Sequence, residues 1–336
     1  MPAILVIGEA LVDLFADPGQ SLAKSKSFTP RFGGAPANVA VSAAKLGGDV
    51  GFIGRVGADS FGDGIIECMA GWGVDTSLVV RDPNRATMLS CVALPSPKMP
   101  DFLLLPGANE NLVSEDIPGS ALEDTKILVF GSVTLAYDSA AAVLDGAKRA
   151  IEAGCEVIFD VNLRPNVWPD LETARKLTLN TIDISSVIKL NMDECEFLFG
   201  HRDPNKATET LLKSGAALIC ISDGTKGSTF VTANANANHP SYVVEAIDAT
   251  GSGDAFLAAV AVLLSASDKK ICDLSSDELK SMAAFANAAG AFVATKLGAM
   301  EADFTQFDVR KLCAWPLSLT TSNINSRSAL KLSSAE

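Results

Sequence analysis

Histidine is scarce in this chain, which has only His201 and His239 among its 336 residues. Neither stands at the spacing of a metal-binding motif, which argues against a histidine-based zinc site and against a Ser-His-Asp triad. Basic residues are outnumbered as well, because 27 Lys and Arg face 40 Asp and Glu and give a formal net charge of −13. A surface of that sign repels phosphate backbones and anionic lipids, so we expect neither nucleic acid nor a membrane as a partner.

Long apolar runs, paired cysteines and the common nucleotide motifs are also missing. No stretch reaches the roughly eighteen apolar residues of a membrane span, and the apolar start contains Glu9 and Asp13 without a basic leader, which indicates a buried strand. The seven cysteines are odd in number and form no CxxC pair, which predicts reduced thiols in a cytoplasmic protein. Neither GxxxxGK(S/T) nor a complete GxGxxG is present.

What is present is an alternation of strand-like and helix-like segments. Short apolar runs predict buried parallel strands at 3–8, 50–54, 126–131, 155–160, 185–191 and 217–222. Helical patterns occur at 38–47, 139–154 and 277–298. This alternation predicts a doubly wound α/β sheet. Residues 13–32 and 86–105 contain turn residues and strand-like pieces without helices, and they predict a small β element outside that sheet.

The stretch IDATGSGDAF, residues 247–256, places five small residues between two aspartates, directly before an apolar run. Gly251 and Gly253 free the backbone around Ser252. A helix that starts just after them would point its unpaired N–H groups and its positive dipole end at the turn, an arrangement that holds an anion such as phosphate. Asp254 then makes sense as a base that works on whatever attacks the phosphate. The same residues also fit a plain turn in which Asp254 supports a helix start.

Four further stretches place polar residues where ligands of open α/β sheets bind, at the carboxyl ends of strands or beside paired glycines. They contain Gly33, Gly34 and Asn38; Asp160, Asn162 and Arg164; Asn191 and Glu194; and Gly224 and Gly227. The donor and acceptor of Asn38 suit a polyol. Taken singly, each stretch also fits an ordinary loop, hairpin or solvated helix start.

Taken together and in this order, the stretches resemble the ribokinase or PfkB family of carbohydrate kinases, from Ile4 to about Ala302. The matching motifs are GGAPANVA, DxNxRxxxW, the Asn191/Glu194 pair, DATGSGD, and FANAAGAFVATKLGAM at 285–300. The resemblance implies a ribokinase-like αβα sandwich with a mostly parallel central sheet, a small β-sheet lid, and a homodimer. The expected division is a core of 1–12, 33–85 and 106–315, a lid of 13–32 and 86–105, and a disordered serine-rich tail of 316–336.

The resemblance also implies the roles of single residues in phosphoryl transfer from ATP to a sugar. Asp254 would be the base, ionised at neutral pH with an ordinary pKa of about 4. Backbone N–H groups of Gly251, Ser252 and Gly253 would stabilise the transferring group. The other implied contacts are Asp13, Gly33, Gly34, Asn38 and Arg164 for the sugar; Lys189, Asn191, Ser222, Gly224, Gly227 and Asn287 for the nucleotide; Glu194 for Mg²⁺ through water; and Asp248, Thr250 and Gly298 for a monovalent cation such as K⁺.

The choice of sugar depends on shorter patterns. GEALVDLF and DVNLRPNVWPD are most similar to fructokinases, which implies conversion of D-fructose to fructose 6-phosphate. DFLLLPGANENL at 101–112 departs from their pattern, because its arginine is missing and PGAN is similar to ribokinase. A ribokinase and a 2-keto-3-deoxygluconate kinase therefore stay open, although the missing cation favours a neutral sugar. A non-catalytic sugar or nucleotide sensor is a further alternative, which would be expected to lack Asp254 or the glycines beside it.

Overall fold

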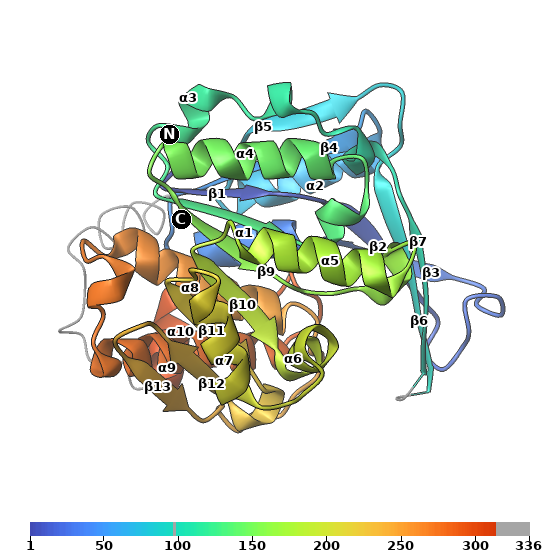
Figure 1. The fold of residues 1–336 in the computed structure, drawn as a ribbon. Helices are drawn as coiled ribbons and strands as arrows, with labels where there is room; N and C mark the ends of the chain where they lie inside the picture. Colours follow the sequence, from blue (N-terminus) through green and yellow to red (C-terminus); the bar gives the residue numbers. More distant parts are fainter. Residues whose placement is uncertain (97–98, 314–336) are drawn as a thin grey trace, which may run out of the picture.

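The strands of the protein form two separate sheets in the computed structural model, which describes residues 1–96 and 99–313 (Figure 1). The larger sheet has nine strands in the order β13-β12-β11-β10-β9-β8-β1-β4-β5, and the smaller has four in the order β3-β2-β6-β7. The tail predicted to be disordered, 316–336, lies outside the described residues. Within the described ranges, no helix has the length and apolar character that crossing a membrane requires.

The larger sheet is parallel from β11 to β5, and only its β12–β13 edge is antiparallel. Its strands are β1 (Ile4–Ile7), β4 (Val50–Gly57), β5 (Asp75–Asp82), β8 (Ile127–Gly131), β9 (Glu156–Asp160), β10 (Val187–Asn191), β11 (Leu218–Ser222), β12 (Ser228–Val231) and β13 (Asn236–His239). All six predicted strands are confirmed. The apolar runs are continuous because β1 and β8 are buried along their whole length, with helices on both faces.

The helices divide between the two faces of this sheet. They are α1 (Ala35–Lys45), α2 (Ser60–Gly71), α3 (Gly119–Leu122), α4 (Ala140–Glu152), α5 (Leu171–Ile182), α6 (Met192–Phe199), α7 (Pro204–Lys213), α8 (Ser252–Ala266), α9 (Ser276–Ala294) and α10 (Gln306–Leu312). One core contains residues of α1, α2, α8, α9 and α10, and the other contains residues of α3 to α7. The side chains of β1 alternate between them, with Ile4 and Val6 in the first core and Leu5 and Ile7 in the second.

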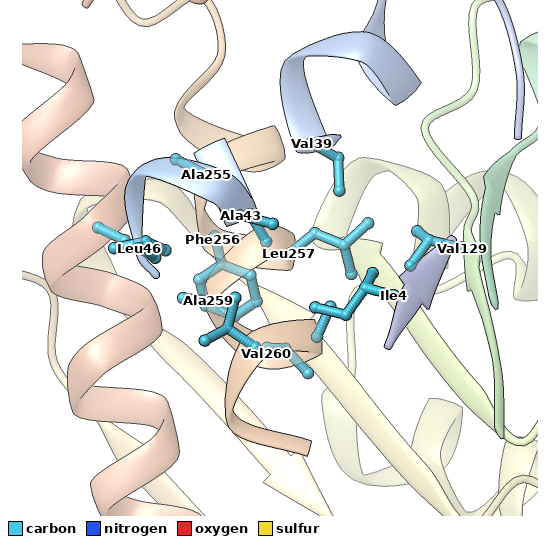
Figure 2. Packing of buried hydrophobic residues seen from close by; sticks show 14 of the residues in the cluster. Ile4, Val39, Ala43, Leu46, Val129, Ala255, Phe256, Leu257, Ala259 and Val260 are labelled. Carbon is cyan, nitrogen blue, oxygen red and sulfur yellow. The ribbon is translucent and has the colours of Figure 1, made fainter. Parts of the chain in front are cut away.

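Helix α8 lies at the centre of the first core and is buried over most of its length. Figure 2 shows Phe256, Leu257 and Val260 of this helix packed among side chains from β1, β8 and α1. Its N-terminus is fixed by α9, where a Cβ added to Gly290 would lie 2.9 Å from the carbonyl oxygen of Ser252. A helix held in this way presents its first turn at a fixed place, and the candidate site is built on that turn.

The smaller sheet stands at the right of Figure 1, beside the main sheet. Its strands are β2 (Leu11–Ala16), β3 (Phe28–Gly33), β6 (Met88–Ser96) and β7 (Met99–Leu105). Strand β2 pairs antiparallel with β3 and parallel with β6, and β6 pairs antiparallel with β7. The predicted fold class, a mostly parallel sheet between helices with a small additional β-sheet, is therefore confirmed.

Candidate active site

A cavity of about 520 Å³ lies between the smaller sheet and the main sheet. The smaller sheet contributes alternate residues of three strands, because successive side chains of a strand point to opposite faces. From these strands the lining residues are Leu11, Asp13, Phe15, Met88, Ser90, Val92, Phe102 and Leu104. The main body contributes Glu9, Asn38, Asn162, Arg164, Lys189, Asn191, Gly251, Gly253 and Asp254, among others. Several of the polar stretches singled out in the sequence therefore meet at one place.

The floor of this cavity includes the first turn of α8. Gly251 caps the helix in the left-handed conformation, with φ 79°, and a Cβ there would lie 2.5 Å from the Cβ of Ala299. The helix begins at Ser252, earlier than predicted, so Gly253 and Asp254 belong to its first turn. Gly253 has no positive φ. The expectation that both glycines free the backbone is therefore wrong for Gly253, because only Gly251 requires glycine for its conformation.

The absence of a side chain at Gly253 instead leaves space beside the Lys189 ammonium group. A Cβ at this position would lie 3.4 Å from the Nζ atom of Lys189. The Lys189 side chain is buried and donates to Oδ1 of Asp160 at 2.9 Å. Since β10 and β9 are neighbours, this pair joins their carboxyl ends. Asp160 thus holds a cation beside the α8 N-terminus, where backbone N–H groups and a positive charge both favour an anion.

Asp254 is buried with 9% of its surface exposed, and it accepts a hydrogen bond of 2.8 Å at Oδ2 from Nδ2 of Asn38. Burial raises the pKa of Asp254 to about 6. The bond from Asn38 and the charges of Lys189 and Arg164 lower the pKa, while the charge of Asp160 raises it. The carboxylate is thus a stronger base than the ordinary value of about 4 assumed from the sequence. It is still mostly ionised at neutral pH.

The glycine pair before α1 allows three segments to approach one another closely. A Cβ on Gly33 would lie 2.5 Å from Oδ2 of Asp13, and one on Gly34, which has φ 103°, would lie 2.6 Å from the carbonyl oxygen of Glu9. Asn38 follows one turn later, and within the described part of the chain its Oδ1 atom is buried without a hydrogen-bond partner. A buried acceptor of this kind beside a polar cavity suits a ligand hydroxyl.

A second cavity, of about 430 Å³, adjoins the first and shares Ser222, Ala249 and Gly253 with it. Its other lining residues include Gly224, Gly227, Tyr242, Phe256, Asn287 and Gly290. Gly227, with φ 104°, packs so closely on His239 that a Cβ would overlap its carbonyl oxygen. Asn287 donates from Nδ2 to the carbonyl oxygens of His239 and Pro240, at 3.0 and 3.3 Å. Four of the six predicted nucleotide residues therefore line this cavity together, namely Ser222, Gly224, Gly227 and Asn287. The other two, Lys189 and Asn191, line the larger cavity.

Comparison with known proteins identifies the family. Residues 1–305 match the model of the pfkB family carbohydrate kinases. The chain belongs to this family. It is 34% identical to the probable fructokinase-5 of Arabidopsis thaliana over 93% of this chain and 97% of that protein, and 32% identical to fructokinase-1 of Oryza sativa subsp. japonica over 92% and 97%.

Solved structures agree with this assignment. A crystal structure of fructokinase with bound ATP from Xylella fastidiosa superposes with a TM-score of 0.85 at 30% identity, covering 94% of this chain and 99% of that one. A double mutant of the Vibrio cholerae O395 fructokinase, with fructose, ADP and potassium ion bound, gives a TM-score of 0.83 at 28% identity over 93% and 98%. The protein is thus a carbohydrate kinase with the ribokinase-like fold.

For this carbohydrate kinase, the residue predicted to organise Mg²⁺ has a clear structural task. Oε2 of Glu194 accepts from the backbone N–H of Asn191 at 2.7 Å, and Oε1 accepts from the N–H of Leu163 at 2.9 Å. Glu194 thereby closes the capping box of α6 and holds the loop after β9. Each carboxylate oxygen has lone pairs left for a metal-bound water, but for an outer-sphere Mg²⁺ role water would have to reach a side chain that is buried and is not among the lining residues of either cavity. That role stays a prediction.

The loops predicted to hold a monovalent cation do meet in the structure. Asp248 accepts at Oδ1 from the N–H of Thr250 at 2.9 Å and at Oδ2 from the N–H of Gly298 at 3.1 Å. These two bonds place both loops around one carboxylate. A cationic side chain reaches the same place, because a Cβ on Gly298 would lie 3.0 Å from Nη1 of Arg31. The Asp248 carboxylate is thus already compensated by two N–H groups and by the charge of Arg31, and binding of K⁺ there stays a prediction.

The sequence predicted no role in the site for Glu9 or, apart from Asp13, for the side chains of the smaller sheet that line the cavity. Glu9 appeared only as a charge that argued against a leader peptide, yet it is buried and lines the larger cavity. The available signal was an acid directly after an apolar run that forms a central strand, since carboxyl ends of such strands carry ligand sites. The other side chains of the smaller sheet gave no comparable signal, because the pairing of its strands decides which of them face the cavity.

Proposed function

We propose that this carbohydrate kinase transfers the γ-phosphoryl group of ATP to the 6-hydroxyl group of D-fructose, which yields fructose 6-phosphate and ADP. The observation that carries the proposal is the junction of the two cavities, where Asp254, Lys189 and the α8 N-terminus lie together. A sugar in the larger cavity and a nucleotide in the smaller one would meet at this junction. The named relatives and neighbouring structures support fructose as the sugar.

The residues at the junction suit an in-line transfer. Asp254 takes the proton of the sugar hydroxyl while its oxygen forms a bond to the γ-phosphorus. The bond from that phosphorus to the bridging oxygen breaks, and ADP leaves with the electron pair. Backbone N–H groups of Gly251, Ser252 and Gly253, together with the Lys189 ammonium, stabilise the charge of the transferring group. Bound Mg²⁺ would neutralise nucleotide phosphate charge, with Glu194 orienting its waters.

The pH dependence of turnover should report Asp254. A base must be ionised to accept the hydroxyl proton, and the pKa of this carboxyl is raised to about 6 by burial. We expect kcat/KM for the sugar to fall as pH decreases through about 6, with a slope approaching tenfold per pH unit below it. A profile measured from pH 4.5 to 8.5 that stays flat down to pH 5 would contradict the assignment.

The charges that line the sugar cavity favour a neutral substrate. Three carboxyl groups, those of Glu9, Asp13 and Asp254, line it with the cations Arg164 and Lys189, and Lys189 is already paired with Asp160. The segment 101–109 contributes Phe102 and Leu104 and contains no arginine. A sugar carboxylate or phosphate would find mainly like charges and apolar groups there. Fructose is therefore proposed ahead of 2-keto-3-deoxygluconate and fructose 6-phosphate, and ribose remains the second candidate because of the PGAN stretch.

A substrate panel tests this choice. We expect kcat/KM for D-fructose to exceed that for ribose, and to exceed those for 2-keto-3-deoxygluconate and fructose 6-phosphate by at least about tenfold. A substrate that leaves polar groups of the site unpaired, or that meets like charges there, is strongly disfavoured. The measurement is ADP release with each sugar under identical conditions. An advantage of tenfold or more for either anionic compound would overturn the interpretation of the lid. Failure to transfer phosphate to any sugar would favour the sensor alternative.

We further propose that the protein is a homodimer joined through its lid. Among the side chains of the small sheet that the structure describes, four large apolar ones are exposed, namely Phe28 (40%), Phe102 (38%), Leu103 (49%) and Leu105 (43%). Leu103 and Leu105 share a face of β7, which is an edge strand, and exposed edges and apolar faces invite a partner. We expect sedimentation at micromolar concentration to show a dimer that Leu103→Asp weakens. A wild-type monomer would contradict this.

A cytoplasmic location is proposed from composition alone. The odd number of cysteines without a CxxC pair suits a reducing compartment. One relative carries the description chloroplastic, so the family is also found elsewhere. Imaging of a fluorescent fusion in the source cell tests the location.

A further inference from the structure

Glu9 is a buried acid whose position no role assigned so far explains. It follows β1 and Gly8 at the carboxyl end of a central strand, and only 3% of its surface is exposed. Its backbone is clamped, because a Cβ on Gly34 would lie 2.6 Å from its carbonyl oxygen and a Cβ on Gly8 would lie 2.4 Å from Cγ of Pro36. The chain thus holds this residue in the wall of the larger cavity.

One oxygen of the Glu9 side chain is fixed by the protein. The hydroxyl of Thr134 donates to Oε2 at 2.7 Å, and Thr134 is itself buried, with its carbonyl oxygen accepting from Ser139 at 2.8 Å. This bond orients the carboxyl group. It does not neutralise the carboxyl charge, since a hydroxyl is uncharged. Burial of an ionised acid without a charged partner is costly.

The charged groups around Glu9 leave it poorly compensated. The pKa of Glu9 is raised to about 7, chiefly by burial and also by the charge of Asp254 on α8, although the Thr134 hydrogen bond, the Glu9 backbone and the charge of Arg164 after β9 lower it. Tyr137, beyond the turn after β8, has its own pKa raised by burial and by the charge of Glu9. Asp160 at the end of β9 is paired with Lys189. Near neutral pH the carboxyl group is therefore able to donate or to accept a hydrogen bond.

We propose that the Glu9 carboxyl group binds a sugar hydroxyl other than the one that is phosphorylated, and that it selects among neutral sugars by where that hydroxyl lies. The proposal rests on the proposed sugar kinase function. Glu9 and Asn38 line the cavity from the main body, while Asp13 lines it from the lid. A sugar between them is contacted on both sides. A hydroxyl that faces Glu9 can supply a polar partner in addition to the Thr134 hydroxyl and the backbone N–H of Glu9.

The test compares three variants. Glu9→Ala is expected to raise the Kd and KM for fructose about 10- to 100-fold, as loss of a hydrogen bond to a charged group does, and to leave the KM for ATP within about twofold. The isosteric Glu9→Gln should retain fructose binding better than Glu9→Ala. Between pH 6 and 8 its fructose Kd should change less than that of wild type, and the change that remains comes from Asp254 in the same cavity. Thr134→Val is the matched control, because it removes the orienting bond and keeps the carboxyl group.

Direct titration of fructose into the protein without ATP separates binding from turnover. An unchanged fructose Kd in Glu9→Ala overturns the proposal. The proposal also fails if Glu9→Ala loses fructose affinity, ATP affinity and melting temperature together and Thr134→Val shows the same losses in full. Phosphorylation assays on the wild-type protein test the proposed function independently. If it phosphorylates ribose in place of fructose, the same comparison with ribose decides the role of Glu9. If it binds no sugar of the panel, both proposals fail.

Discussion

Replacement of Asp254 by asparagine is expected to lower kcat about 10²- to 10⁴-fold, the usual effect of losing a general base. The Kd values for fructose and ATP should stay within a few-fold of wild type, because an amide oxygen can accept the bond that Nδ2 of Asn38 gives to Oδ2. Asp268→Asn is the control, since that aspartate is exposed on the surface. Retention of more than half of the wild-type kcat would show that Asp254 is not the base.

The same variant should not lose stability. The pKa of Asp254 is about 6 in the folded state and 3.8 in the reference state, so the folded protein binds this proton more tightly. The free energy of unfolding therefore falls as pH rises from about 4 to 6, and above that the ionised side chain costs up to about 3 kcal/mol. Asparagine removes that cost. We expect the melting temperature of Asp254→Asn at pH 8 to equal or exceed that of wild type, and a lower value would contradict the burial argument.

The two glycines of the α8 turn should respond differently to the same change. Gly251→Ala forces a side chain into a left-handed conformation and against Ala299, which costs about 1–3 kcal/mol of stability. Gly253→Ala has a helical backbone and meets only Nζ of Lys189, at an ordinary 3.4 Å, so its melting temperature should stay near wild type. Its methyl group nevertheless enters the junction of the cavities.

We therefore expect Gly253→Ala to lower kcat at least about tenfold without unfolding the protein, because displacement of a stabilising donor costs about 10²–10³ in comparable sites. Thermal melts and ADP release on both variants give the comparison. Full activity of Gly253→Ala would show that this turn does not stabilise the transferring phosphoryl group. An unchanged melting temperature in Gly251→Ala would contradict the assigned backbone conformation.

Six strands of the main sheet and the glycine turn before α8 were predictable because they depend on local patterns. The runs at 3–8 and 126–131 are apolar throughout, as strands covered on both faces are, and both form central strands. Glycines and an acid before an apolar run indicate a helix start, and the N-terminus of a helix favours an anion. Such patterns report local conformation, and the doubly wound arrangement follows from their alternation.

What could not be predicted depends on which side chains face one another across elements. Asp160 looked like a ligand residue, and the register of β9 with β10 makes it the partner of Lys189. The backbone conformations of Gly251 and Gly253 differ because α8 begins at Ser252, so Gly251 precedes the helix and Gly253 belongs to its first turn. The raised pKa of Asp254 depends on burial, which a local motif does not contain. The position of Glu9 directly after a central strand was visible in the sequence, whereas its burial in the cavity wall depends on the pairing of the smaller sheet.

Phosphorylation of the 6-hydroxyl group of fructose with ATP is tested most directly by the product of the reaction. Wild-type protein incubated with ATP, Mg²⁺ and ¹³C-labelled D-fructose can be followed by ³¹P and ¹³C NMR. The account predicts one ADP for each sugar phosphate formed, with phosphorus coupled to C6. Phosphate on another carbon, or ATP left intact beside unchanged fructose, would contradict it.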